Sequence, residues 1–537
     1  MARLRLNLLA AALSFYVSSR SVSAINVSLP ISAPGGSQGL SPTLLSFSIE
    51  QDRWPDWTGT DERNEFTHSA LLNYAALTGQ PPNIRVGANS EDHTFWSPTV
   101  TIEEASFPPP NTITPYPEAT SITVGDAYYS LSRFLPTGTR MVWGVNLGAD
   151  NVTNAVNMAK AIVGAFRTLA VQLSGVVLER IEVGNEADLY KNNGLRPRNW
   201  TVQEYVADWE NVAGAVAEAV GINSRNDPVT LQGAAFAGQG FTPREIFDLG
   251  ILDSAPGKAI SVISQHQYSA AFCNGGDFPL VSFMSKAAVR GNLTIFEADI
   301  AATNSKGLVY ILGETNSIAC HGAPGVSNTA GAALWAVDYT LQAAKLGIKQ
   351  TFFHEGVGYK YNFIQPITLN RSTVDGSTLD PPSPPHVQPS YYAGLLINNF
   401  IGNTGAAQLV ELAVNDTNVS GYAAFEHGRL VRAAFVNLHA WLLSSTGDRP
   451  SVHIDFDFAR GATADSQKDV DSFWGHATAV ARRIVIQHAD DVANLTWAGQ
   501  SYETPDAQPL GIPVFETVDL SQGIDLRATE AVLVSFS

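Results

Sequence analysis

The segments Arg180-Ile-Glu-Val-Gly-Asn-Glu186 and Leu308-Val-Tyr-Ile-Leu-Gly-Glu314 are short, β-rich apolar runs that each end in a glutamate. They belong to a set of eight such runs between residues 44 and 356. Short apolar runs of this kind are typical of the buried strands of a parallel sheet. The eight runs are Leu45–Ile49, Asn83–Val86, Arg140–Asn146, Arg180–Val183, Thr230–Ala234, Val262–His266, Val309–Leu312 and Thr351–His354.

Helical patterns lie between these runs. Asn154–Gln172, Val202–Val220 and Thr329–Leu346 carry apolar residues at a spacing near 3.6. Alternating strands and helices favour the α/β class, and eight such units predict a (β/α)8 TIM barrel over residues 43–375. An open doubly wound sheet is the alternative. Two long segments, Ser90–Asp126 and Cys273–Thr294, are expected to be insertions, and the first is rich in proline.

The pattern changes after Tyr361. The segment Asp380–Pro389 holds five prolines and predicts a stiff, non-helical connector. Beyond it, alternating runs such as Leu430–Leu438 and Val480–Ile486 predict a β-sandwich accessory domain over residues 390–537. Residues 25–42 open with the alternating strand Ile25–Leu29, which we expect to join that sandwich, so that both ends of the chain build one domain.

Composition limits the classes of function. Hydrophobic residues make up 45% of the 537 residues and charged residues 15%, so the chain can bury a large core. Acidic residues exceed basic ones by 50 to 32, a net charge of −18, which disfavours nucleic acid and anionic membranes as partners. Two cysteines allow one disulfide and exclude a thiolate metal cluster.

The N-terminus has the pattern of a secretory signal peptide over residues 1–24. Arg3 and Arg5 precede an apolar run from Leu6 to Val17, and the small residues that follow end at Ala24, where we expect cleavage. The run is too short to span a bilayer, and a buried N-terminal helix is the alternative. Sequons such as Asn151-Val-Thr fit a secreted, extracellular glycoprotein that is soluble and free of membrane after processing.

The two glutamates that end strands four and seven are the strongest candidates for catalysis. In a TIM barrel the active site lies at the carboxyl ends of the strands, and strands four and seven face each other across the mouth. Two converging carboxyl groups are what glycoside hydrolysis requires. A glutamate at a strand end can instead cap the following helix, and Glu297 and Glu355 are further acidic candidates. We expect Glu182 to be paired inside the barrel or in its outer layer.

Four motifs resemble glycoside hydrolase family 79, which includes β-glucuronidases and, more distantly, heparanase. The resemblance covers most of residues 40–365 and, more loosely, the β-rich tail. The motifs are Ser46-Phe-Ser-Ile-Glu-Gln-Asp-Arg-Trp-Pro-Asp-Trp-Thr-Gly59, Arg85-Val-Gly-Ala-Asn-Ser-Glu-Asp-His93, Glu182-Val-Gly-Asn-Glu-Ala-Asp-Leu-Tyr190 and Gly313-Glu-Thr-Asn-Ser317.

The resemblance implies a role for each matching residue. Glu186 is the expected general acid/base and Glu314 the expected nucleophile, in a retaining mechanism that uses no metal and no cofactor. The resemblance also implies that Asn185 binds the sugar 2-hydroxyl, a contact that strengthens as positive charge develops at the anomeric carbon. Tyr268 resembles the tyrosine that hydrogen-bonds the nucleophile.

Three further positions are expected to bind the terminal sugar. Glu50, at the end of strand one, resembles the residue that binds its hydroxyls, and Asn89, after strand two, adds to it. The family holds the C6 carboxylate with a tyrosine after strand eight, for which Tyr361 is preferred over Tyr359. The loop after strand seven departs from some relatives because it carries Cys320 and His321 and has no tyrosine.

The remaining candidates are weaker. Cys273 and Cys320 fall in neighbouring loops after strands six and seven, so we expect one disulfide, with two unpaired thiols as the alternative. Three histidines near strand ends lack metal-ligand spacing and are expected to be hydrogen-bonded wall residues. Three tryptophans after strands one and two stack on sugars if exposed and belong to the core if buried. These residues are His93, His266, His354, Trp54, Trp57 and Trp96.

The hypothesis is a secreted, retaining exo-β-glucuronidase whose partner is a carbohydrate: it removes terminal β-linked glucuronic acid, or its 4-O-methyl form, from glycans or small glucuronides. Loss of three arginines with the signal peptide takes the charge from −18 to −21, which disfavours a sulfated polymer as substrate. Another retaining barrel glycosidase (a β-glucosidase, a xylosidase or a heparanase-like endo-glucuronidase) and a non-catalytic carbohydrate-binding protein are the alternatives. The sequence leaves the oligomeric state open.

Overall fold

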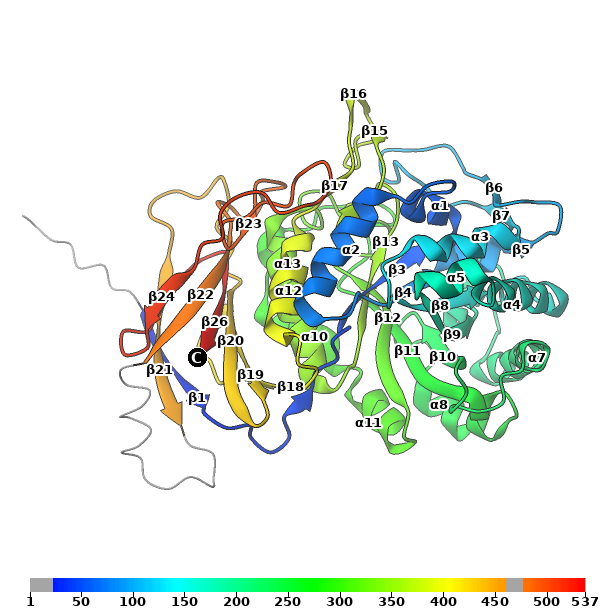
Figure 1. Ribbon diagram of the computed structural model, residues 1–537, viewed down its shortest axis with the longest axis horizontal. Helices are drawn as coiled ribbons and strands as arrows, with labels where there is room; N and C mark the ends of the chain where they lie inside the picture. The colour runs from blue at the N-terminus through cyan, green and yellow to red at the C-terminus, as the bar shows by residue number, and fades with distance from the viewer. Residues whose placement is uncertain (1–22, 460–476, 537) are drawn as a thin grey trace, which may run out of the picture.

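The computed structural model describes residues 23–459 and 477–536, so residues 1–22 of the expected signal peptide lie outside the described residues. Eight parallel strands form a closed barrel (Figure 1), and the pairing of the last strand with the first closes it. The predicted TIM barrel is therefore confirmed, and the open sheet is excluded. Its strands are β3 (Leu45–Glu50), β4 (Ile84–Gly87), β8 (Arg140–Val145), β9 (Val177–Val183), β10 (Thr230–Phe236), β11 (Ile260–Tyr268), β12 (Val309–Asn316) and β13 (Thr351–Glu355).

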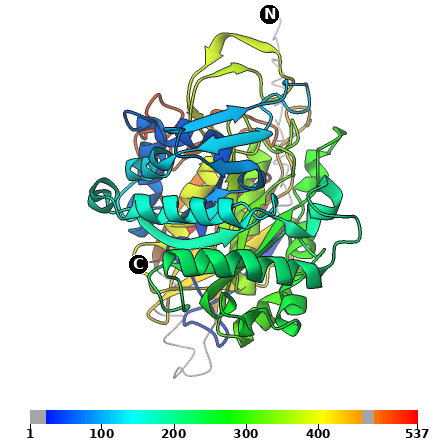
Figure 2. The ribbon, with the colours of Figure 1, turned by 90° about the vertical axis from the view of Figure 1, so that its right-hand side faces the viewer.

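Helices cover the outside of the barrel, and α4 and α7 pack side by side on it (Figure 2). Helix α7 begins at a capping box in which Thr201 and Glu204 bond each other's backbone, and it ends at Gly221 in the left-handed conformation. The covering helices are α2 (Glu65–Thr78), α4 (Val152–Phe166), α7 (Val202–Val220), α8 (Pro243–Asp248), α11 (Glu297–Ser305), α12 (Ala330–Leu346) and α13 (Ser390–Ile401).

The helix predicted over Asn154–Gln172 is two helices, α4 and α5 (Leu169–Ser174). The break falls at Thr168, whose extended backbone lets its side chain accept the N–H of Val171 and cap α5. The apolar spacing continues across the break, so the periodicity alone could not detect it.

Both predicted insertions fold on the rim of the barrel. The first contains a small sheet, in which β7 pairs with β5 and β6, and the second contains α9 and α10. Smaller helices and 3₁₀ turns complete the rim. These elements are β5 (Thr94–Trp96), β6 (Glu103–Ser106), β7 (Ser121–Val124), α1 (Trp54–Thr58), α3 (Asp126–Ser130), α6 (Tyr190–Asn193), α9 (Leu280–Phe283) and α10 (Lys286–Thr294).

The C-terminal part is a β-sandwich of an eight-stranded and a three-stranded sheet, as its alternating pattern predicted. Apolar side chains of both sheets, among them Val27, Phe435 and Ile454, are buried in one cluster. The strands are β1 (Ser23–Pro30), β2 (Gln38–Gly39), β18 (Ala407–Glu411), β19 (Val419–Glu426), β20 (Arg429–Asn437), β21 (Ser451–Ala459), β22 (Thr478–Val485), β23 (Thr496–Trp497), β24 (Glu516–Asp519), β25 (Ile524–Arg527) and β26 (Glu530–Phe536).

Strand β1 brings the start of the described chain into this sandwich. It pairs with β21 in parallel along its whole length, and its buried residues Ile25, Val27 and Leu29 alternate with exposed residues. Strand β2 pairs with β18 in the other sheet. The two ends of the chain therefore share one hydrophobic core.

Helix α13 lies between the barrel and the sandwich. It packs on α2 and α12 of the barrel and touches β20, β22 and β23 of the sandwich. This helix places the last barrel element at Ile401, later than the expected boundary at residue 375. The proline-rich connector is non-helical, as expected, but it is also paired, because β16 (Thr378–Ser383) forms a hairpin with β15 (Leu369–Arg371), and β17 (His386–Val387) pairs with β14 (Ile364–Gln365).

Candidate active site

A cavity of about 1080 Å³ opens at the carboxyl ends of the barrel strands. Another cavity, of about 590 Å³, lies at the opposite end of the barrel between α4, β9 and α7. Its described lining residues include no pair of carboxyl groups. The chemistry therefore belongs to the larger cavity. It is lined, among others, by Asn89, Glu118, Asn185, Glu186, Leu189, Asn192, Tyr268, Cys273, Glu314, Cys320, His321, His354 and Tyr361.

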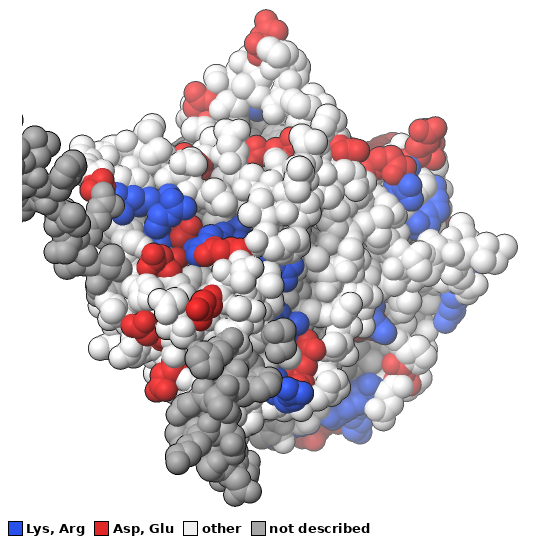
Figure 3. Space-filling view, turned by 60° about the vertical axis from the view of Figure 1, so that its left-hand side comes forward, with Lys and Arg blue, Asp and Glu red and all other residues white. Residues whose placement is uncertain are grey.

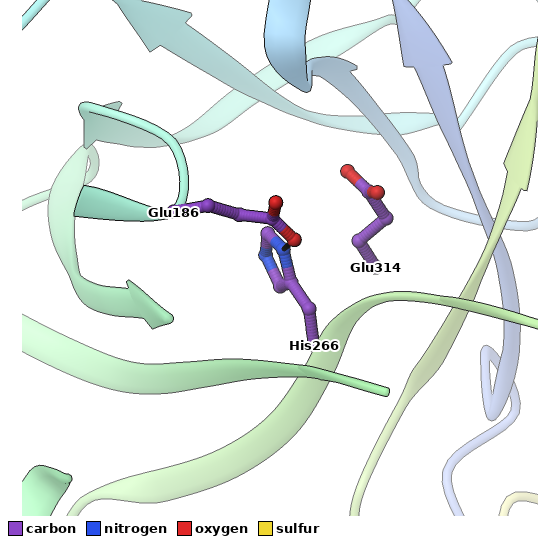
Figure 4. Close-up of side chains that lie close together, drawn as sticks. All are labelled: Glu186, His266 and Glu314. Atoms are coloured by element: carbon purple, nitrogen blue, oxygen red, sulfur yellow. Dashed lines mark hydrogen bonds and ion pairs between the residues drawn. The ribbon is translucent and has the colours of Figure 1, made fainter. Parts of the chain in front are cut away.

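The structure brings Glu186 and Glu314 together in this cavity, although 127 other residues separate them in the chain. Glu186 follows β9 with a left-handed backbone (φ 50°), and its N–H donates to the carbonyl of Ala235 at 2.8 Å. Glu314 lies in β12. One oxygen of each carboxyl group and a ring nitrogen of His266 all lie within 4.8 Å of one another (Figure 4).

The surroundings of Glu314 stabilise its charged form. Its Oε2 accepts a hydrogen bond from Arg85 at 2.7 Å, and its Oε1 accepts one from the Tyr268 hydroxyl at 2.7 Å. Burial alone would raise the pKa of Glu314, but the charges of His354 and Arg85 and the bond from Tyr268 outweigh burial and lower the pKa to about 2. Glu314 is therefore an ionised carboxylate at neutral pH.

The surroundings of Glu186 have the opposite effect. Burial, followed by the negative charge of Glu314, raises the pKa of Glu186 to about 8. His266 Nδ1 lies 2.9 Å from Glu186 Oε1, and burial lowers the pKa of this histidine to about 4, so the ring is neutral and does not favour ionisation of Glu186. At neutral pH the pair consists of one protonated and one charged carboxyl group, the arrangement needed for an acid and a nucleophile.

Arg85 on β4 connects these groups, a role that the sequence did not suggest. Its buried guanidinium donates to Glu182 and Glu314 and, at 2.7 Å, to Asn185 Oδ1, and it also bonds Ser48. Glu182 is thus paired inside the barrel, as expected. One fixed cation orients both the expected nucleophile and the amide expected at the sugar 2-hydroxyl.

Asn185 and Asn89 lie side by side on the wall of the cavity. Arg85 holds the Asn185 oxygen, which leaves the Asn185 amide nitrogen directed toward Asn89 Oδ1 at 3.4 Å. Asn89 is exposed and donates to Glu118 at 3.4 Å. Both amides are therefore available to sugar hydroxyls in the cavity.

Glu50, expected to bind the sugar, is placed differently. It is buried behind the cavity wall, where one oxygen accepts from the N–H (3.0 Å) and hydroxyl of Ser90 and the other lies 3.2 Å from His354 Nε2. Burial would lower the pKa of His354, but Glu314 and Glu50 raise it to about 9. Glu50 therefore helps to keep His354, which does line the cavity, positively charged.

The two tyrosines after β13 have different positions. Tyr361 lines the cavity and its ring lies 6.2 Å from that of Tyr268. Tyr359 is buried beneath His321, with the two rings stacked at 3.7 Å and an angle of 11°. The preference for Tyr361 at the expected carboxylate position agrees with this placement. His321 also bonds Glu118 at 2.9 Å, and the sequence did not point to Glu118 because it lies inside the proline-rich insertion and ends no barrel strand.

A disulfide joins Cys273 and Cys320 across the loops that follow β11 and β12. The same two loops are also paired through a bridge between Ala271 and Ala319. Both cysteines line the cavity, so the disulfide braces the rim near Tyr268 and Glu314.

Comparisons with known proteins agree with this geometry. Residues 421–533 match the family model described as "Glycosyl hydrolase family 79 C-terminal beta domain". The chain is 27% identical to a protein of Neurospora crassa named "Beta-glucuronidase", over 92% of this chain and 90% of that protein. It is 29% identical to a "Beta-glucuronidase" of Aspergillus niger, over 92% and 88% of the two chains.

Solved structures show the same fold. A "4-O-alpha-L-rhamnosyl-beta-D-glucuronidase" of Fusarium oxysporum matches with a TM-score of 0.75 and 21% identity, over 95% of this chain and 100% of that chain. A family 51 α-L-arabinofuranosidase of Bifidobacterium longum matches with a TM-score of 0.57 and 15% identity, over 96% and 99%. The resemblance to glycoside hydrolase family 79 is confirmed. Together, the comparisons indicate that the chain is a glycoside hydrolase.

The cluster of Glu186, His266 and Glu314 must be distinguished from a metal site, because its ligand atoms are close enough to hold an ion. Arg85 already places a positive charge 2.7 Å from Glu314, and Glu186 is held protonated at neutral pH. Arg85 would repel a divalent cation, and the cation would have to displace the proton of Glu186. The cluster therefore fits an acid and a nucleophile better than it fits a metal.

Other sequence candidates lie outside the candidate active site. Glu297 is exposed at the start of α11, and Glu355 is buried, where it accepts the N–H groups of Phe363 and Ile364. Trp54 and Trp57 are buried in the core rather than exposed at the mouth. Trp96 donates to Asp126 at 2.8 Å. None of the helices in the described part of the chain has the length and apolar character that crossing a membrane requires.

Proposed function

We propose that the protein is a secreted, exo-acting, retaining β-glucuronidase that hydrolyses terminal β-linked glucuronic acid. One observation carries the proposal: two carboxyl groups in one cavity are held in opposite protonation states, Glu186 neutral and Glu314 charged. The named relatives from Neurospora crassa and Aspergillus niger support the glucuronide as the substrate class.

The spacing of the two groups supports retention of configuration. Oxygens of Glu186 and Glu314 lie within 4.8 Å, whereas inverting enzymes leave about 6.5–9.5 Å between the carboxyl groups for a water molecule. In the first step Glu314 bonds to the anomeric carbon, the glycosidic C–O bond breaks, and Glu186 gives its proton to the leaving oxygen. In the second step water attacks the same carbon, Glu186, now ionised, takes a proton from that water, and the bond between the carbon and Glu314 breaks.

Recognition of the C6 carboxylate is assigned to the wall formed by the loops after β12 and β13. Tyr361 offers a hydroxyl, the backbone N–H groups of Cys320 and His321 in the cavity lining are the further donors, and the charged His354 adds a positive field. The hydroxyl and N–H donors are neutral. They hold the C6 carboxylate without placing a further cation against Glu186, whose proton is needed for the proposed catalysis.

The cavity is unsuited to a long sulfated chain. In the described part of the chain, no lysine or arginine lines it. On the sandwich side of the molecule, which Figure 3 brings forward, basic and acidic side chains are interspersed. A sulfated polymer needs a basic track at the cavity, so the proposal is an exo enzyme that removes terminal glucuronic acid from glycans or small aglycones.

Secretion is proposed from the N-terminal sequence. Cleavage after Ala24 leaves Ile25 as the first residue and keeps the buried positions Ile25, Val27 and Leu29 of β1. N-terminal sequencing of protein recovered from the culture medium of a eukaryotic host tests this. Retention inside the cells with the leader intact would contradict it.

The decisive experiment compares aryl β-D-glycosides that differ at C6: the glucuronide, the glucoside and the xyloside. We expect kcat/KM for the glucuronide to exceed the others by at least about 100-fold, the scale of one or two charge-assisted hydrogen bonds. Proton NMR of the first product should show the β-anomer. Faster hydrolysis of the glucoside, or faster release of heparan sulfate fragments than of the aryl group, would overturn the proposal.

A further inference from the structure

Glu118 is an acidic side chain of the cavity that the mechanism above does not use. It lies between β6 and β7 in the proline-rich insertion, and its side chain is 28% exposed. The next residue fixes the backbone, because the N–H of Ala119 donates to the buried carboxylate of Asp52 at 2.7 Å. The insertion therefore presents Glu118 to the cavity from a position anchored to the end of β3.

Hydrogen bonds from three loops fix the position of the Glu118 carboxylate. His321 Nε2, after β12, lies 2.9 Å from Oε1, the Tyr359 hydroxyl, after β13, donates to the same oxygen at 3.4 Å, and Asn89, after β4, donates to Oε2 at 3.4 Å. The stacking of His321 on Tyr359 fixes the imidazole. A carboxylate has about four acceptor positions, and two of these three bonds are long, so Glu118 can accept further hydrogen bonds from a ligand.

The barrel places Glu118 on the side of the mouth opposite the acid. Going round the closed barrel, β13 lies four strands from β9, which carries Glu186, and the loops that hold Glu118 follow β12, β13 and β4. A pyranose ring whose anomeric carbon lies between Glu186 and Glu314 directs its far edge, C3 and C4, away from the breaking bond. Glu118 lies on that far side, between the loops after β12, β13 and β4.

We infer that Glu118 accepts hydrogen bonds from the 3- and 4-hydroxyl groups of the terminal sugar and thereby determines which sugar the site takes. The inference rests on the proposed function for the identity of that sugar. Glu50 does not take this part in the structure, because it is buried and does not line the cavity. A carboxylate that faces two neighbouring hydroxyl groups can bind both at once.

The test combines a change in the enzyme with a change in the substrate. Glu118→Ala and Glu118→Gln are compared with the unchanged protein on an aryl β-D-glucuronide and on its 3-deoxy and 4-deoxy analogues. Glu104→Gln is the control, because Glu104 is an exposed glutamate of the same insertion that does not line the cavity. Thermal unfolding of each variant checks that the insertion still folds.

We expect Glu118→Ala to lower kcat/KM for the full glucuronide by about 10- to 100-fold, the size of a hydrogen bond to a charged group. On each deoxy analogue, the loss caused by Glu118→Ala should be smaller than on the full glucuronide, because one of the two bonds is already absent there. Glu118→Gln should lose less than Glu118→Ala, and Glu104→Gln should lose nothing on any of the substrates.

An equal loss on the glucuronide and on both deoxy analogues would overturn the inference, since it would show that Glu118 only supports the fold of the rim. The outcome is separable from that of the proposed function. If the protein prefers another C6 group, the same comparison is made with the deoxy analogues of that glycoside, because the argument concerns C3 and C4.

Discussion

At the scale of single residues, the proposed catalysis depends on how the buried charges around Arg85 and His354 divide two similar glutamates into an acid and a nucleophile. Position at the end of a strand was sufficient to predict from the sequence that Glu186 and Glu314 meet at the mouth of the barrel. Their pKa values were not predictable, because these depend on contacts from β4 and β13 that are distant in the chain. The same reason explains why Arg85 and Glu118 were missed.

Variants of the two glutamates should differ in how strongly their loss of activity depends on the leaving group. Glu314→Ala should abolish turnover on every substrate, because no covalent intermediate can form. Glu186→Ala should lose about 10²- to 10⁴-fold on alkyl glucuronides but much less on a dinitrophenyl glucuronide, whose departure needs no proton. Steady-state kinetics on the two substrates measure this. Equal losses of the two variants on both substrates would contradict the assigned roles.

The pH profile of kcat/KM follows from the two pKa values. Glu314 must be ionised, and its pKa of about 2 keeps it so as the pH falls through the usual range of a glutamate. Glu186 must be protonated, and its pKa of about 8 keeps it so until the pH rises past that value. We expect activity to persist well below pH 4 as long as the fold survives, and to fall above about pH 8. Loss of activity with a midpoint below pH 6 on the alkaline side would refute this assignment.

Arg85 should control the acid limb of that profile. Arg85→Met removes the positive charge beside Glu314, so the pKa of Glu314 rises and the acid limb moves to higher pH. It also leaves Glu182 buried without its partner, which should lower the free energy of unfolding by about 3–5 kcal/mol. Urea denaturation and a pH series measure the two effects. Arg85→Lys keeps the charge and should move the acid limb less.

At the scale of elements, the sequence predicted all eight barrel strands because each is a short apolar run between helical patterns. Their ends were less predictable: β11 and β12 run on to Tyr268 and Asn316, beyond the apolar part of each run. These polar extensions carry the candidate site residues, because β11 stays paired with β12 through His266, Gln267 and Tyr268 after a register shift at His266. Function therefore lies where the hydrophobic pattern stops.

The disulfide between Cys273 and Cys320 should act on the loops that follow these two strands. Joining residues 47 positions apart stabilises a fold by about 4 kcal/mol in the chain-entropy model. The double variant Cys273→Ala with Cys320→Ala should unfold at a lower temperature and show a raised KM, since both residues line the cavity. Calorimetry and kinetics test this. An unchanged KM with a lowered unfolding temperature would limit the disulfide to a stabilising role.

At the scale of the whole molecule, a buried ionic network joins the barrel to the sandwich. Arg290 on α10 bonds Asp338 on α12 and, at 2.7 Å, Glu411 on β18, while the hydroxyl of Tyr422 on β19 donates to Asp338 at 2.6 Å. Asp338 is fully buried, so it requires these partners. The eight-stranded sheet therefore has one face against the three-stranded sheet and the other against barrel helices (Figure 1).

This arrangement predicts that damage at β1, far from the cavity, reaches the active site. Val27→Lys buries a charge without a partner in the sandwich core and should lower the free energy of unfolding by about 3–5 kcal/mol. Ser28→Lys is the matched control, since Ser28 is exposed on the same strand opposite Asp457. The eight-stranded sheet also supports α12 and α13. We therefore expect Val27→Lys to lose its glycosidase activity and its β-structure in one thermal transition, at a lower temperature than the control. Activity that outlasts the loss of β-structure would show instead that the barrel stands without the sandwich.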